Sequence, residues 1–217
     1  MSTTAIELPL FPLGCVLFPG AVRPLHIFET RYCQMIKDCL RESKSFGIVL
    51  VKEDSQYLHE EPHAVGTMAE IHNLDRQADG CYNLMAVGTM RFRIIDCHRE
   101  KPYLSGFVEP FVDRRESEEE LAGYTKRARD LFMTYLKMVL EKSDEGEIEI
   151  SVPSDAEGLS HFIAYFLDMD DEKKLKYLEL TSTSQRLQDE IAFLRREVPF
   201  MRHMLFKEPP RERIQLN

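Results

Sequence analysis

The stretch MRFRIID, residues 90–96, decides the fold class of the first half of the chain. Its side chains alternate along an extended backbone, so that one face would carry Met90, Phe92 and Ile94. The opposite face would carry Arg91, Arg93 and Ile95. A period of two is typical of a strand with one buried face, and it predicts a β-sheet.

Similar short runs, rich in Val, Ile and Phe, lie on both sides of this stretch. They predict strands at residues 6–11, 16–18, 46–52, 65–74, 82–87, 90–96 and 104–112. Pro19-Gly20 predicts a tight turn, because Pro fixes φ and Gly can take positive φ. Asp79-Gly80 predicts a hairpin, and Gly88 suggests a second, tighter connection. Short strands at this spacing are typical of a small barrel or sandwich.

Helical periodicity appears once in this half and then throughout the second half. Between Phe28 and Leu40 apolar residues recur at helical spacing. After residue 115, capping boxes at Ser117/Glu120 and Ser154/Glu157 predict two helix starts. Further helices are expected after the acidic turn at residues 168–171 and from residues 181–184, and the run with Gly146 should break a helix. Pro199 should end or kink the last helix.

The two periods predict an α+β protein with two parts. Residues 1–115 should form a β-rich lobe with one inserted helix, and residues 116–217 a C-terminal α-helical bundle. The helical part is a candidate spacer or oligomerisation surface.

Composition narrows the class of protein further. The chain has 217 residues and a formal net charge of -9, which disfavours general binding to nucleic-acid phosphates. It contains no apolar run of about 18 residues and no recognisable signal peptide, so we expect a cytoplasmic protein without membrane contact. Its five cysteines form no C-x-x-C pair and are expected to be reduced, mostly as small core residues.

The most specific segment is LPLFPLGCVLFPGAVRPLHIFETRY, residues 8–32. It resembles the start of the N-terminal substrate-binding domain of Lon proteases. The resemblance continues through VGTMAEI, DGCYNLMAVGTMRFRI, LSHFIAYFL, KLKYLEL and RLQDEIAFLRREV, and so covers roughly residues 6–205.

This resemblance implies a β lobe of the PUA-like pseudobarrel type followed by a helical bundle, which agrees with the two periods. It also implies a polypeptide-binding role. Lon proteases continue into ATPase and Ser-Lys protease modules, and this sequence has no G-x-x-x-x-G-K-[ST] phosphate-binding loop. We therefore expect a standalone protein of the Lon N-terminal type, or part of one, that is not an enzyme.

One literal match to a catalytic motif is present and is interpreted as incidental. His59-Glu60-Glu61-Pro62-His63 fits H-E-x-x-H, a zinc motif that must be helical. Pro62 would break that helix, so a surface loop is expected. No nucleophile elbow is present, and adjacent Ser160 and His161 would point apart on a helix. We expect no catalytic residue, metal or cofactor.

A candidate peptide-binding segment follows the opening Pro-rich run. Its members are Pro24, Leu25, His26, Phe28, Glu29, Arg31 and Tyr32. The aromatic side chains could anchor apolar groups, and Arg31 could bind an acidic or terminal carboxylate. The simpler interpretation is an exposed helix start decorated by Glu29 and Arg31, with Phe28 and Tyr32 packed inward.

Two functions follow as expectations. The first is a non-catalytic module that binds unfolded or partly folded polypeptide, or a partner protein, through apolar contacts. The alternative is a PUA-like RNA-binding protein, in which Arg91, Arg93, Arg99 and Lys101 would form a basic ridge on the outer sheet face. Fold analogy alone is weak support for this alternative, and the acidic net charge weighs against it, so no nucleic-acid partner is expected.

Overall fold

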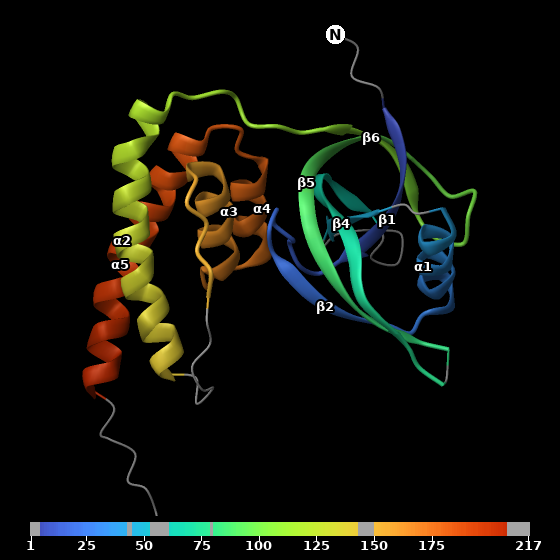
Figure 1. Ribbon diagram of the computed structural model, residues 1–217, viewed down its shortest axis with the longest axis horizontal. Coiled ribbons are helices and arrows are strands. Elements are labelled where there is room, and N and C mark those ends of the chain that lie inside the picture. The colour runs from blue at the N-terminus through green and yellow to red at the C-terminus, as the bar shows by residue number, and fades with distance from the viewer. Residues whose placement is uncertain (1–4, 43–44, 53–60, 79, 143–149, 208–217) are drawn as a thin grey trace, which may run out of the picture. The chain divides into compact units, whose positions relative to one another are not determined.

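Figure 1 shows the computed structural model, which describes residues 5–42, 45–52, 61–78, 80–142 and 150–207. Within these residues the chain forms six strands and five helices, which confirms the predicted α+β class. The chain divides into two compact units. Unit 1 comprises residues up to Arg115 together with His161–Ser182, and unit 2 comprises Glu116–Ser160 and the residues from Thr183 onward.

All six strands belong to unit 1 and form a sheet that closes on itself. They are β1 (Ile6–Leu13), β2 (Val22–Ile27), β3 (Phe46–Val51), β4 (Pro62–Arg76), β5 (Tyr82–His98) and β6 (Ser105–Pro110). The order is β2-β5-β4-β3-β1-β6, and β6 also pairs with β5. Five strands therefore form a ring, while β2 is attached outside it through β5 (Figure 1). This ring is the expected pseudobarrel.

The long strand β5 makes the closure possible because different parts of it pair with different neighbours. Its first residues pair with β2 and its last residues with β6. Three register shifts interrupt its pairing, two opposite β4 at Thr67/Ala69 and His72/Asp75 and one between Ile94 and Asp96 of β5 itself. The first of these bulges breaks the expected alternation at Met90, which is 44% exposed, whereas Arg91 and Phe92 pair with successive residues of β4 and are 3% and 1% exposed. The predicted face is therefore wrong for Met90. Arg91 and Phe92 lie on opposite faces as predicted, but the face with Arg91 is covered at this point by Asp113 and the end of helix α4 (Asp171–Glu179).

Gly88 lies inside β5, so the expected connection at this position is wrong. A Cβ atom at Gly88 would lie 2.3 Å from the carbonyl oxygen of Phe18. The Gly88 amide donates to the Ala21 carbonyl at 2.9 Å, and the Gly20 amide donates to the Gly88 carbonyl at 2.9 Å. The glycine is needed because another backbone segment crosses the strand here.

That crossing segment contains residues 16–18, which were predicted as a strand. They lie between β1 and β2 without strand structure, and the Thr67 hydroxyl donates to the Leu17 carbonyl at 2.6 Å. The two turn predictions nearby are confirmed. Gly20 has φ 78 beside an Ala21 amide that donates to Phe18, and Gly80 has φ 89 in the β4–β5 hairpin. Asp79 lies outside the described residues.

Unit 1 also contains helix α1 (Thr30–Glu42), the end of α3 (Ala156–Phe166) and α4 (Asp171–Glu179). The expected division at residues 115 and 116 placed His161–Ser182 in the helical part, whereas the structure groups it with the strands. Ala164, Leu175 and Leu178 share one buried cluster with the barrel residues Phe18 and Phe46, which explains the grouping.

The N-terminal end of α4 is tied to the barrel by polar contacts. Asp170 caps the helix by accepting from the Lys173 amide, as the acidic turn predicted. The Val16 amide donates to Asp171 at 3.0 Å, and the His63 ring lies 3.1 Å from Glu172. Pro62 and His63 begin β4, which is strand rather than the surface loop expected for HEEPH. His59 and Glu60 lie outside the described residues.

Unit 2 is built on α2 (Glu118–Lys142) and α5 (Thr183–Lys207), which lie side by side in Figure 1. Both helices begin at the same end, because Glu116 accepts from the Ser184 amide at 3.0 Å. Both helices carry fully buried side chains, Phe132 on α2 and Leu187 and Leu194 on α5. None of the described helices is long and apolar enough to cross a membrane.

The helix ends test the capping predictions directly. The capping box of α2 is confirmed, with the Ser117 amide donating to Glu120 and the Glu120 amide donating to Ser117. The predicted Ser154 cap is wrong, because Asp155 accepts from the Gly158 amide at 2.7 Å and caps α3. Pro199 lies within α5, which continues to Lys207. The run around Gly146 lies outside the described residues.

All five cysteines are free thiols. Cys33 and Cys39 are buried in the core, whereas Cys15 and Cys81 are half-buried and Cys97 is exposed. Burial raises the pKa of Cys15 and of Cys97, which keeps both in the neutral thiol form. Only two of the five are therefore core residues, fewer than expected.

Candidate polypeptide-recognition face

The seven predicted peptide-binding residues follow one another through β2 into the first turn of α1. Pro24, Leu25 and His26 belong to β2, while Phe28 and Glu29 form the link to the helix. They do not all face the same way. Leu25 packs against the core cluster, and Pro24, His26 and Phe28 are exposed.

Strand pairing extends this exposed side of β2 across two more strands. Val22, Pro24 and His26 lie opposite Val87, Met85 and Asn83 of β5, and residues directly opposite each other share a face of the sheet. Val87 and Met85 in turn lie opposite Glu70 and His72 of β4. We call this surface the β2 outer face; it consists of Val22, Pro24, His26, Phe28, Glu70, His72, Asn83, Met85 and Val87.

Phe28 is the most prominent apolar side chain of the β2 outer face, with 66% of its surface exposed. Its ring stacks on His26 with 5.9 Å between centroids and an angle of 24°. The His26 ring is itself fixed by a hydrogen bond of 2.7 Å between Nδ1 and the Asn83 amide oxygen. The expectation that Phe28 packs inward is therefore wrong: it is an exposed aromatic group held by its neighbours.

Charged groups flank the apolar part of the face on both sides. Glu29 and Arg31 form an ion pair at 2.8 Å beyond Phe28, and His72 lies 3.6 Å from Glu70 on β4. The Arg31 guanidinium also lies 4.6 Å from the Tyr32 ring centroid. A carboxylate ligand would thus have to compete with Glu29 for Arg31.

Tyr32 belongs to the core rather than to the recognition face. It is 6% exposed, and its ring centroid lies 4.4 Å from that of Phe11. Burial raises the pKa of its hydroxyl. This half of the simpler interpretation, in which Tyr32 packs inward, is confirmed.

The backbone of β2 is a poor template for an added strand. In the described residues β2 pairs only with β5, which leaves one side of it without a strand neighbour. Pro24 has no amide hydrogen, and the Val22 carbonyl already accepts from the Tyr165 hydroxyl at 3.1 Å. Side chains of the β2 outer face, rather than backbone pairing, are suited to contact a ligand.

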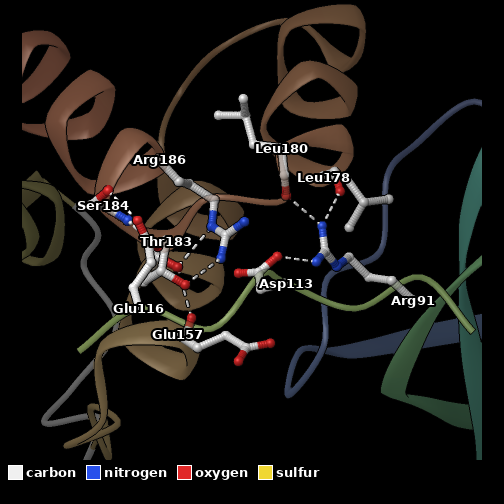
Figure 2. Close-up of polar contacts among 10 residues, drawn as sticks. Arg91, Asp113, Glu116, Glu157, Leu178, Leu180, Thr183, Ser184 and Arg186 are labelled. Atoms are coloured by element: carbon white, nitrogen blue, oxygen red, sulfur yellow. Dashed lines mark hydrogen bonds and ion pairs between the residues drawn. The ribbon is translucent and has the colours of Figure 1, made fainter. Parts of the chain in front are cut away.

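Arg91 contradicts the predicted basic ridge. Its side chain is buried and forms an ion pair with Asp113, as Figure 2 shows. Its Nη1 donates to the carbonyl oxygens of Leu178 and Leu180, at 2.6 and 2.7 Å, at the C-terminal end of α4. Arg91 therefore fixes α4 to the barrel.

Only Arg93 of the two strand arginines is exposed, and it lies 4.5 Å from the Phe111 ring centroid. The Arg91 guanidinium lies 4.9 Å from the centroid of the same ring, so both guanidinium groups contact one aromatic side chain. The RNA-binding alternative depended on a solvated ridge containing both arginines, and it receives no support from this arrangement.

Part of the β2 outer face was beyond sequence reasoning. Residues 22–27 were not expected as a strand, because Pro24 interrupts any periodic pattern there. Without β2, nothing in the sequence connects Phe28 with Met85, Val87, Glu70 and His72. The one available signal was that residues 82–87 alternate like a strand with a second face.

Comparisons with known proteins agree with this fold. A family model described as the ATP-dependent protease La (LON) substrate-binding domain matches residues 7–196. Among curated relatives, Lon protease 2 of Myxococcus xanthus is 27% identical over 197 residues, covering 88% of this chain and 24% of that protein. Lon protease of Syntrophomonas wolfei is 28% identical over 186 residues, covering 83% and 23%. The chain thus spans about a quarter of the length of these relatives.

Solved structures show the same relationship. The Lon N-terminal domain protein from Xanthomonas campestris superposes with a TM-score of 0.64 at 29% identity, covering 86% of this chain and 98% of that one. The N-terminal domain of Mycobacterium avium complex Lon protease gives a TM-score of 0.66 at 19% identity, covering 88% and 98%, and supports the fold alone. The family model covers most of the described barrel and helices, and the chain belongs to the Lon substrate-binding domain family.

Proposed function

We propose that this chain is a non-catalytic recognition module that binds apolar stretches of unfolded or partly folded polypeptide, or of a partner protein, on the β2 outer face. Family membership supports the class of ligand, because the matching family is a substrate-binding domain of a protease. The site is inferred from the residues themselves. The observation that carries it is Phe28, an aromatic side chain 66% exposed and stacked on His26.

The chemistry of the face fits an apolar ligand better than a charged one. Val22, Pro24, Met85 and Val87 offer aliphatic surface beside Phe28, and Met adapts its shape to different partners. Because Phe28 is already ordered by His26, little side-chain entropy is lost when a ligand covers it. The flanking charges are paired with each other, so they would form the polar rim of such a contact.

Delivery of the ligand to a protease would complete the role. The relatives that this chain matches over about a quarter of their length are Lon proteases. Recognition by this chain would then be coupled to degradation of the bound polypeptide.

Binding to a permanently unfolded model protein, compared with its folded form, tests the proposal. We expect the wild-type chain to retain the unfolded form, and Phe28→Ala to weaken retention at least about tenfold, as for loss of an aromatic anchor. Phe107→Ala is the matched control, because Phe107 is an exposed phenylalanine on β6, outside the β2 outer face.

Equal binding by Phe28→Ala and wild type would remove the β2 outer face as the site. Equal absence of retention for the unfolded and folded forms would remove polypeptide recognition itself. A loss of the same size in Phe107→Ala would show that binding is not specific to this face.

A further inference from the structure

Glu190 is a buried acid in the middle of α5 and does not belong to the β2 outer face. Its residue is 0% exposed, and it lies between the buried side chains Leu187 and Leu194 along the same helix. Neither of its carboxyl oxygens has a hydrogen-bond partner among the described residues. A carboxylate in such surroundings would lose its hydration without compensation, whereas a neutral carboxylic acid would lose much less.

The nearest cation does not offset this burial. Arg186 precedes Glu190 by one helical turn and is also fully buried. Its Nε donates to the Ser160 hydroxyl at 2.7 Å and its Nη2 to the Thr183 hydroxyl at 3.5 Å; Figure 2 shows Arg186 beside Thr183. The guanidinium is therefore engaged by hydroxyl groups and makes no hydrogen bond to Glu190.

Several other charged groups of unit 2 are exposed or have partners of their own. On α5, Asp189 is exposed and accepts from Gln185 at 2.9 Å. On α2, Arg129 donates to the Pro153 carbonyl at 2.5 Å. The charged side chains of Lys126, Arg127, Asp130 and Lys137 on the same helix are exposed.

At the start of α3, Asp155 and Glu157 are exposed, and Asp155 caps the helix. Burial raises the pKa of Glu190 well above its usual range, Arg186 opposes this effect, and Asp189 adds to it.

We propose that Glu190 is a pH-dependent switch within unit 2. Its carboxyl group is neutral in the folded state, and loss of its proton loosens the packing of α5 on α2. This inference is independent of the proposed function. A folded state that holds a proton which the unfolded state has released becomes less stable as the pH rises. Unit 2 should therefore be most stable under mildly acidic conditions, and its helix packing should loosen as the pH increases.

Urea unfolding of the full chain between about pH 6 and about pH 9 measures this linkage. For one retained proton, the unfolding equilibrium constant rises by up to about tenfold per pH unit until Glu190 ionises in the folded state. We expect this rise in wild type and in Asp189→Asn, which alters the exposed neighbour. Glu190→Gln has no proton to lose and should show at least about tenfold less change over the same range.

Two direct readouts keep the test decisive if Glu190→Gln folds poorly. Difference infrared spectra of wild type should show the C=O stretch of a protonated carboxylic acid at neutral pH, and this band should vanish on unfolding. Hydrogen exchange, corrected for the intrinsic effect of pH, should accelerate in α5 and α2 peptides before it does so in β4 and β5.

An ionised carboxylate at neutral pH, seen as absence of the protonated band, would overturn the proposal. So would a Glu190→Gln variant that keeps the full pH dependence of wild type. Accelerated exchange in the barrel strands first would place the sensitive group outside unit 2 and would equally refute it.

Discussion

Replacing Arg91 should destabilise unit 1 more than any surface substitution, because Arg91 joins β5, Asp113 and the end of α4 in one buried network. The side chains of Arg91 and Asp113 are 2% and 4% exposed, so water does not screen the pair. Arg91→Met keeps most of the side-chain length but leaves the Asp113 carboxylate without its guanidinium. It also removes the donor shared by the Leu178 and Leu180 carbonyls.

The expected loss can be estimated from these contacts. Breaking a buried ion pair by removing one partner costs about 3–5 kcal/mol. The two carbonyl oxygens at the end of α4 would each lose a charged donor, a contribution that overlaps with the first and is not simply additive. We expect about 4 kcal/mol, a large part of the roughly 5–15 kcal/mol by which a domain is folded.

Urea unfolding followed by circular dichroism measures this loss, with two comparison variants. Arg93→Met removes an exposed guanidinium that stacks on the same Phe111 ring, and should cost at most about 1 kcal/mol. The double variant Arg91→Met/Asp113→Leu removes the stranded carboxylate and should recover part of the loss. If Arg91→Met lies within about 1 kcal/mol of wild type, the network is not what holds α4 on the barrel.

Two further predictions concern positions with clear packing or hydrogen-bonding roles. Gly88→Ala should destabilise the protein by roughly 2–4 kcal/mol, because its Cβ would lie 2.3 Å from the Phe18 carbonyl oxygen. Gly123→Ala in helix α2 has no atom within 4 Å of its Cβ and should stabilise the protein by about 0.5–1 kcal/mol. Thermal unfolding distinguishes the two variants, and similar shifts of Tm for both would contradict the close approach at Gly88. Tyr103→Phe removes the hydroxyl that donates to Asp38 at 2.8 Å and should cost about 1–2 kcal/mol at neutral pH. Burial and the bond to Asp38 raise the pKa of Tyr103, so the folded state retains this proton above the ordinary tyrosine range and wild type should lose stability there faster than Tyr103→Phe. Parallel pH profiles of the two proteins would refute this.

The sequence was sufficient for the elements whose local signals agree with their tertiary surroundings. The hairpin at Gly80 and the turn at Gly20 combine a positive φ with the residue type that favours it. The box formed by Ser117 and Glu120 needs only a contact between residues three apart. Such features depend on short stretches of chain and can be inferred without knowledge of the fold.

Long-range contacts account for the predictions that were wrong. Gly88 looks like a turn residue in the sequence, but it is required because the segment around Phe18 crosses β5. Arg91 alternates like an exposed residue, yet Asp113 and the end of α4 cover it, and no local pattern reveals this. The same holds for the β2 outer face, which joins β2 and Phe28 to the β4–β5 hairpin, far away in the sequence.

Closure of the barrel also determines how this protein can avoid aggregating with an unfolded chain. A ring of five strands has no exposed edge at which a foreign strand could add, and in the described residues the remaining edge belongs to β2. Pro24 and the Tyr165 hydroxyl make that edge unreceptive. A recognition module of the proposed kind could thereby release unfolded segments again, since the contact would not grow into a continuous intermolecular sheet.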